Sequence, residues 1–284
     1  MKNIVKMIGL FALIGFSFFY SDKVVSVIKE EDKIMIELES VKNVYKVDSV
    51  DASIVGKTIV PGINGRNINV DNSYKKMKNS GSFNKSLLVF DEVAPDVSIS
   101  NNKDKFIIRG NSNKQMVSIL FVLEDDKYLD KIETILKSKD VVANYFVSYS
   151  YLIDNSMRIK EMELAEIYSY GDNGEYMPDN LLFSNNLISR IRKSDAKYCL
   201  ASNMEEEIIS LCSENNLYTV TPNIVGDKSP YAMVKDKINS GSIILFDMNK
   251  ETVEELAVII DYIKGKGFKI GGLSTLISED LVMD

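Results

Sequence analysis

The chain has 284 residues, of which 45% are hydrophobic and 26% are charged, and its formal net charge is -7. This composition is typical of a globular protein with a sizeable core, and an acidic balance without a basic stripe disfavours nucleic acid as a partner. The sequence contains no histidine, which excludes every metal site and every proton transfer that depends on an imidazole.

Residues 1–22 are predicted to form a signal anchor. Lys2 and Lys6 lie ahead of or at the edge of an apolar run from Met7 to Tyr20, and bulky side chains stand where a small-residue cleavage site would lie. A basic end before such a run is oriented toward the cytoplasm. We therefore expect a single-pass protein of the cell membrane with an extracytoplasmic body. A cleaved signal peptide and a buried N-terminal helix are the alternatives.

The next two segments differ in character. Residues 23–50 are charged and helix-prone, which predicts a juxtamembrane helical spacer. Residues 51–109 contain short β-prone pieces, including Thr58–Val60, Asn67–Val70 and Ser86–Phe90, separated by Pro-Gly and Asn-Gly turns. We interpret residues 51–109 as one small β-rich accessory module.

From residue 110 onward, strand and helix patterns alternate. The expected strands are Met116–Leu123, Val141–Val147, Leu164–Ser169, Lys197–Leu200, Leu217–Val220, Ser242–Asp247 and Phe268–Gly271. Helical stretches separate them, and Thr252 and Glu255 have the spacing of a capping box that opens one. Such alternation predicts parallel strands in a barrel or an open α/β sheet, and periodicity does not decide between the two.

Cys199 and Cys212 are the only cysteines in the chain. An extracytoplasmic body permits a disulfide between them. Free cysteine is among the most buried residue types, so we expect two buried free thiols, with the disulfide as the alternative.

Several segments after residue 110 resemble one enzyme family. The segments Gly241–Asp247, Glu251–Phe268 and Leu273–Leu276 are similar to the C-terminal end of the polysaccharide deacetylase, or NodB-homology, domain. Earlier segments also resemble parts of this domain in the same order. They are Gln115–Phe121 for its first strand, Lys127–Leu136 for its first helix, and then Ala143–Val147 and Leu164–Ile167. The resemblance implies an α/β fold, a distorted (β/α)7 barrel over residues 110–284. It also implies removal of acetyl groups from polysaccharides with a divalent metal held by one Asp and two His, another Asp as base and a further His as acid.

The positions that this family uses for catalysis and metal binding carry other residues. By the resemblance, Val122 stands in place of the base and Leu123 in place of the metal-binding Asp. Tyr170 and Gly174 stand in place of the two histidine ligands, and Asp247 in place of the acid. Alkyl side chains neither bind a metal nor take a proton, and no shift of register supplies a histidine. We therefore expect a chain without the family's metal, without a cofactor and without its catalysis.

The cleft at the carboxyl ends of the strands is the candidate binding site, because ligands bind there in barrels of this kind. Its candidate residues are Leu123, Glu124, Tyr170, Asp172, Cys199 and Asp247. Carboxylates at this end would suit Mg²⁺ or Ca²⁺, but the consecutive residues Glu124, Asp125 and Asp126 converge poorly on one ion, so we interpret them as solvated. Tyrosines between residues 145 and 176 suit sugar stacking or core packing, and Tyr170 is the favoured sugar contact.

Three functions remain open. The leading hypothesis is a non-catalytic envelope protein whose barrel binds cell-wall polysaccharide or an envelope protein. The first rival is a carbohydrate-modifying hydrolase, namely a deacetylase that acts on C–N non-peptide bonds by a non-standard mechanism. The second is a scaffold that presents residues 51–109. Fold-level likeness alone supplies the glycan in these hypotheses.

Overall fold

The structure is a computed structural model and describes residues 32–281. Within this range the chain divides into two compact units, one formed by residues 32–49 and 64–93 and the other by residues 50–63 and 94–281. The predicted signal anchor and the first part of the spacer lie outside the described residues. Among the helices of residues 32–281, none has the length and apolar character needed to cross a bilayer.

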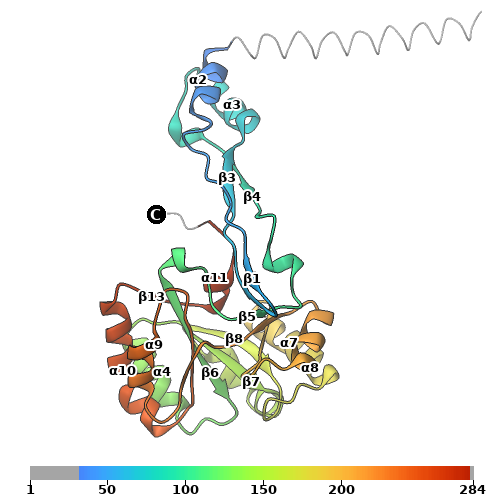
Figure 1. Ribbon diagram of the computed structural model, residues 1–284, viewed down its shortest axis with the longest axis vertical. Helices are drawn as coiled ribbons and strands as arrows, with labels where there is room; N and C mark the ends of the chain where they lie inside the picture. The colour runs from blue at the N-terminus through green and yellow to red at the C-terminus, as the bar shows by residue number, and fades with distance from the viewer. Residues whose placement is uncertain (1–31, 282–284) are drawn as a thin grey trace, which may run out of the picture. The chain divides into compact units, whose positions relative to one another are not determined.

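The smaller unit consists of two helices and a two-stranded ribbon (Figure 1). The helices are α2 (Lys33–Val41) and α3 (Val70–Lys78), and β3 (Gly65–Ile68) pairs antiparallel with β4 (Phe90–Val93). Their core is formed by Ile34, Met35, Leu38, Ile68, Tyr74 and Met77. The strand predicted at Ser86–Phe90 is wrong, because the Asn84 side chain accepts from Ser86 N and starts a 3-10 turn, η1 (Lys85–Leu87).

Residues 51–109 contribute to both units, so the observed division differs from the single module predicted. The hairpin of β1 (Ser53–Val55) and β2 (Thr58–Val60) belongs to the larger unit, where β2 pairs parallel with β5 (Phe106–Ile107). Ile59 of β2 is buried in the main core of that unit. Burial of this strand against a partner far along the chain explains why the local turn pattern did not show the division.

The larger unit contains two sheets whose strands are almost all parallel (Figure 1). The first has the order β11 (Ile224–Gly226), β12 (Ile243–Phe246), β6 (Met116–Leu123), β7 (Ala143–Ser148) and β8 (Ala165–Tyr170), and β13 (Lys269–Ile270) also pairs with β6. The second has the order β1, β2, β5, β10 (Tyr218–Val220) and β9 (Tyr198–Leu200).

The predicted α/β fold with parallel strands is confirmed, but the strands do not form one continuous hydrogen-bonded ring. Neighbouring strands β8 and β9 belong to different sheets. On the β9 side of this seam, the amide of Leu200 donates to the Tyr176 hydroxyl. The Tyr176 hydroxyl thus accepts a backbone hydrogen bond that the neighbouring strand would accept in a closed barrel. The strands β1, β5 and β11 were not predicted.

Helices and 3-10 turns connect these strands. The helices are α4 (Leu129–Ser138), α5 (Tyr149–Asp154), α6 (Ser156–Glu161), α7 (Pro178–Arg192), α8 (Glu206–Glu214), α9 (Pro230–Lys237), α10 (Lys250–Gly265) and α11 (Leu273–Ile277), and the turns are η2 (Ile99–Asn101) and η3 (Ser112–Lys114). The predicted capping box is wrong. Asn249 caps α10 by accepting from Thr252 N at 2.8 Å, and Glu255 accepts from Tyr231 N at 2.7 Å in α9.

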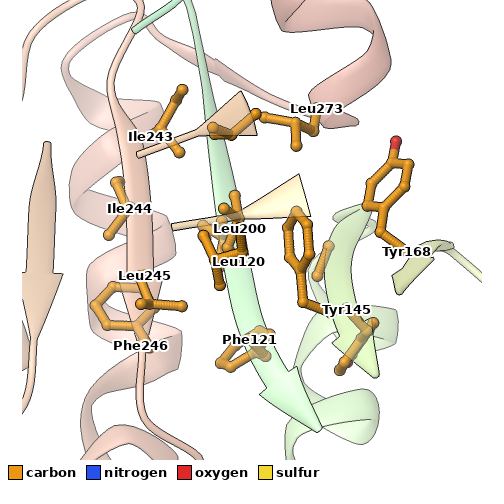
Figure 2. Close-up of a cluster of buried hydrophobic side chains, with 14 of the residues drawn as sticks. Leu120, Phe121, Tyr145, Tyr168, Leu200, Ile243, Ile244, Leu245, Phe246 and Leu273 are labelled. Atoms are coloured by element: carbon orange, nitrogen blue, oxygen red, sulfur yellow. The ribbon is translucent and has the colours of Figure 1, made fainter. Parts of the chain in front are cut away.

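The main core joins the first sheet to its helices and also to the second sheet, and Figure 2 shows Leu200 of β9 packed beside Leu120 of β6. Phe121 of β6 stacks on Tyr145 of β7 with 5.5 Å between ring centroids, and Phe246 of β12 lies 6.2 Å from Phe121. All four residues of β12 are buried. Continuous burial of this kind is what a parallel strand covered on both faces requires, and it positions the strand ends where the candidate cleft was predicted.

Candidate functional site

The carboxyl end of β6 carries no side chain able to bind a metal at the two family positions. Leu123 is fully buried in the main core, and Val122 is half-buried and packs against that core. Leu123 therefore does not line an open cleft. The carboxylates that follow, Glu124, Asp125 and Asp126, are all exposed, in keeping with the interpretation of solvated side chains.

The two positions that correspond to histidine ligands contact each other. Tyr170 is the last residue of β8, and Gly174 follows in the next loop with φ at +83°. A Cβ atom at residue 174 would lie 2.9 Å from the Tyr170 hydroxyl oxygen. A larger side chain at residue 174 would therefore compete with the Tyr170 phenol for the same space.

Burial is the main cause that raises the pKa of Tyr170, and the nearby Glu124 carboxylate adds to it. The nearby Ser202 side chain lowers this pKa in part. The Tyr170 ring also meets Tyr176 edge to face, with 5.9 Å between centroids. The phenol is therefore held in place as a neutral group, and of the predicted cleft residues it is the one with an aromatic surface at the strand ends.

Two predicted carboxylates accept hydrogen bonds from the backbone. Glu124 Oε1 accepts from Asn173 N at 3.0 Å, and Asp172 Oδ1 accepts from Ser150 N at 3.0 Å. Both bonds hold the loop after β8, the first to the end of β6 and the second to the start of α5. These carboxylates thus fix the loop after β8 in place. We call the region around Glu124, Ser150, Tyr170 and Asp172, at the carboxyl ends of these strands, the mouth of the fold.

Tyr176 bridges the seam between β8 and β9. Its hydroxyl accepts from Leu200 N at 2.9 Å and has the Leu200 and Ser169 carbonyl oxygens at 3.2 and 3.4 Å as acceptors. Burial of the hydroxyl strongly raises the pKa of Tyr176. Sequence reasoning counted this residue among several tyrosines and had no signal that its partners are backbone groups of two strands.

Cys199 is joined to Cys212 by a disulfide that links β9 to α8, so the expectation of free thiols is wrong. Both cysteines are fully buried, in a small core with Phe106, Leu181 and Leu217. The spacing of the two cysteines in the sequence is compatible with free thiols and with a disulfide. The disulfide depends on the packing of α8 against β9, which the sequence does not show. Cys199 accordingly contributes no surface to a cleft.

Asp247 follows β12 and borders a separate pocket of about 320 Å³, together with Asp227, Lys228, Asn249 and Glu251. Partial burial, and then the neighbouring Asp227, raise the pKa of Asp247. Within residues 32–281, no group of three or more His, Cys, Asp or Glu side chains is placed to hold a metal ion. The six predicted residues thus divide: Glu124, Tyr170 and Asp172 share one neighbourhood, Asp247 lies at another, and Leu123 and Cys199 are core residues.

Comparison with known proteins identifies the fold. No protein-family model matches the chain. The structure of wild-type BA3943 from Bacillus anthracis, described as a pseudoenzyme of carbohydrate esterase family 4 (CE4), is similar with a TM-score of 0.65 and 25% identity, over 89% of this chain and 97% of that one. The fold is that of the family 4 carbohydrate esterases, and the chain is a degenerate protein of the polysaccharide deacetylase type.

A further solved structure and one sequence relative are similar to this deacetylase-type chain. The Bc1960 peptidoglycan N-acetylglucosamine deacetylase has a TM-score of 0.55 at 19% identity, over 62% of this chain and 95% of that one. The uncharacterized protein YlxY of Bacillus subtilis (strain 168) is 27% identical over 278 residues, which are 90% of this chain and 86% of that protein. The absence of histidine from the chain, and the residues expected at the family's catalytic positions, Val122, Leu123, Tyr170, Gly174 and Asp247, are in keeping with the pseudoenzyme description of BA3943.

Proposed function

We propose that the protein is a membrane-anchored, extracytoplasmic and non-catalytic member of its family that binds cell-wall glycan. The residue types at the predicted metal-ligand positions carry the proposal, because the side chains of Leu123, Tyr170 and Gly174 do not supply the Asp and the two His that the family uses. The choice of glycan is supported by the fold shared with a peptidoglycan N-acetylglucosamine deacetylase.

Aromatic side chains next to the mouth support a sugar-binding role. Tyr149 follows β7 directly and meets Phe183 of α7 edge to face, with 6.1 Å between centroids. Phe183 is 50% exposed. The hydrogen bond from Ser150 N to Asp172 ties this pair to the loop after Tyr170. Exposed aromatic rings offer apolar faces on which sugar rings pack, so Tyr149 and Phe183 extend the surface that Tyr170 begins.

The disulfide supports the extracytoplasmic location. Disulfides form and persist in oxidising compartments, and Cys199–Cys212 is fully buried within the larger unit. Protease treatment of intact cells tests this directly. We expect the body to be digested from outside while a fragment containing residues 1–22 remains with the membrane fraction. Protection of the whole chain in intact cells would contradict the location.

Binding to purified sacculi tests the glycan. We expect the full-length chain in mild detergent to sediment with sacculi, and the double variant Tyr149→Ala, Phe183→Ala to lose at least about tenfold in affinity, since each ring contributes roughly 1 kcal/mol. Val258→Ala, a change at an exposed apolar residue of α10, is the matched control and should bind normally.

The result distinguishes glycan from an envelope protein. Sacculi stripped of protein by protease should still bind the chain if glycan is the ligand. Loss of binding after that treatment would assign the surface to a protein partner, and absence of binding to untreated sacculi would overturn the glycan proposal.

A further inference from the structure

A pocket of about 370 Å³ lies on the outer side of the first sheet, between α4 and α6 and next to β7. The residues that matter for its chemistry are Glu133, Lys137, Tyr145, Arg158, Glu161 and Glu163. We call it the acidic pocket. It shares no lining residue with the mouth of the fold around Tyr170, and the family resemblance assigns it no role. Its volume is at the lower end of the range found for small-molecule sites.

Tyr145 contributes a hydroxyl group that has no hydrogen-bond partner. The residue is 1% exposed, and its ring is fixed by stacking on Phe121. Buried tyrosine hydroxyls normally find a partner, because an unpaired polar group in the interior costs free energy. Burial raises the pKa of Tyr145, and the charges of Glu133 and Arg158 also act on it. Tyr145 thus lines the same pocket as Glu133 and Arg158, and its hydroxyl makes no bond to either.

The pocket has an excess of negative charge. Arg158 pairs with Asp130 at 2.7 Å and with Glu133, and Lys137 pairs with Glu163 at 2.8 Å. Four carboxylates thus face two cations, and Glu161 has no ion pair among residues 32–281. Since no group of acidic side chains in that range is placed to hold a metal ion, the charge suits an organic cation.

We propose that the acidic pocket binds an amino sugar, with the ammonium group paired to Glu161 and a ring hydroxyl bonded to Tyr145. Carboxylates accept hydrogen bonds from both ammonium and hydroxyl groups, so a ligand that carries both satisfies the site better than either alone. The Tyr145 hydroxyl is shielded from solvent, so its bond to the ligand requires a lining side chain to shift, and we expect this to be Arg158, which lines the same pocket and is 33% exposed.

Calorimetry with a β-1,4-linked glucosamine dimer and its N-acetylated form tests the proposal on the full-length chain in detergent. We expect the free-amine dimer to bind at least about tenfold more tightly than the neutral one, as a charge-assisted bond requires. Equal affinity for the two dimers, or no binding of the free-amine dimer, would overturn the proposal. So would equal or tighter binding of a lysine-rich tripeptide, which carries ammonium groups without sugar hydroxyls.

Two variants localise the binding. Glu161→Gln should weaken the free-amine dimer about fivefold to tenfold, and Tyr145→Phe should weaken it by a similar factor while melting at the same or a higher temperature than the wild type. Unchanged affinity in either variant would refute the assignment. Thr252→Val also removes a buried hydroxyl without a partner, in α10, and serves as the control with unchanged binding. The sacculus variants at Tyr149 and Phe183 should leave the dimer affinity unchanged, so this test is independent of the proposed function.

Discussion

Tyr176→Phe removes a single hydroxyl from the seam between β8 and β9 and keeps the ring. The Leu200 amide loses its acceptor at 2.9 Å, and the Leu200 carbonyl loses a donor at 3.2 Å. Leu200 is 1% exposed, so water does not readily replace these bonds. A buried backbone group left without its partner costs about 1–3 kcal/mol, and removal of the hydroxyl's own burial cost offsets part of this. We expect the free energy of unfolding to fall by about 2 kcal/mol.

Urea unfolding followed by far-ultraviolet circular dichroism measures the change on the chain without residues 1–23. Tyr145→Phe is the matched control, because it makes the same chemical change at a hydroxyl that has no partner. We expect that variant to be as stable as the wild type or about 1 kcal/mol more stable. A Tyr176→Phe loss below about 0.5 kcal/mol, the size of an ordinary surface effect, would refute the role of this hydroxyl in the seam.

Three further changes test other parts of the structure. Replacing Cys199 and Cys212 by alanine should lower the free energy of unfolding by about 3 kcal/mol, and an unchanged urea midpoint would argue against the disulfide. Burial lowers the pKa of Lys114 to about 8. Between this pH and the ordinary lysine pKa of about 10.4, the folded state therefore binds fewer protons than the unfolded state. This lysine's contribution to stability therefore rises with pH in that window, and Lys114→Met should reduce the gain in urea midpoint between pH 7.5 and 9.5. Gly241→Ala should cost more than about 2 kcal/mol in the same assay, because φ is +88° and the new Cβ would lie 2.3 Å from a backbone oxygen. Gly265→Ala, with nothing within 4 Å, should change stability by less than about 1 kcal/mol.

The longer buried strands of the larger unit could be predicted because they are continuous apolar runs in the sequence. Parallel strands covered on both faces need such runs, and β6 and β12 show them. The loss of the family's chemistry was equally accessible, since the absence of histidine and the alkyl residues Val122 and Leu123 are matters of residue type. These inferences do not depend on how segments pack.

The arrangement of the candidate site could not be predicted, because it depends on which way each side chain faces. Leu123 is buried in the core, whereas Glu124, the next residue, is exposed and holds a loop. Cys199 was placed at the cleft by its position in the chain, but it is buried in the disulfide with Cys212. Tyr176 likewise has partners that are adjacent only in the folded chain.

Acetate release from acetylated peptidoglycan, measured with zinc or cobalt added in excess, tests most directly whether the deacetylase site is lost. The residues at the family positions predict no acetate above the amount released without protein, while an active family 4 deacetylase run in parallel releases it. Metal-dependent release by this chain that a chelator abolishes would contradict the account, because Tyr170 and Gly174 would then have to leave room for a working metal site.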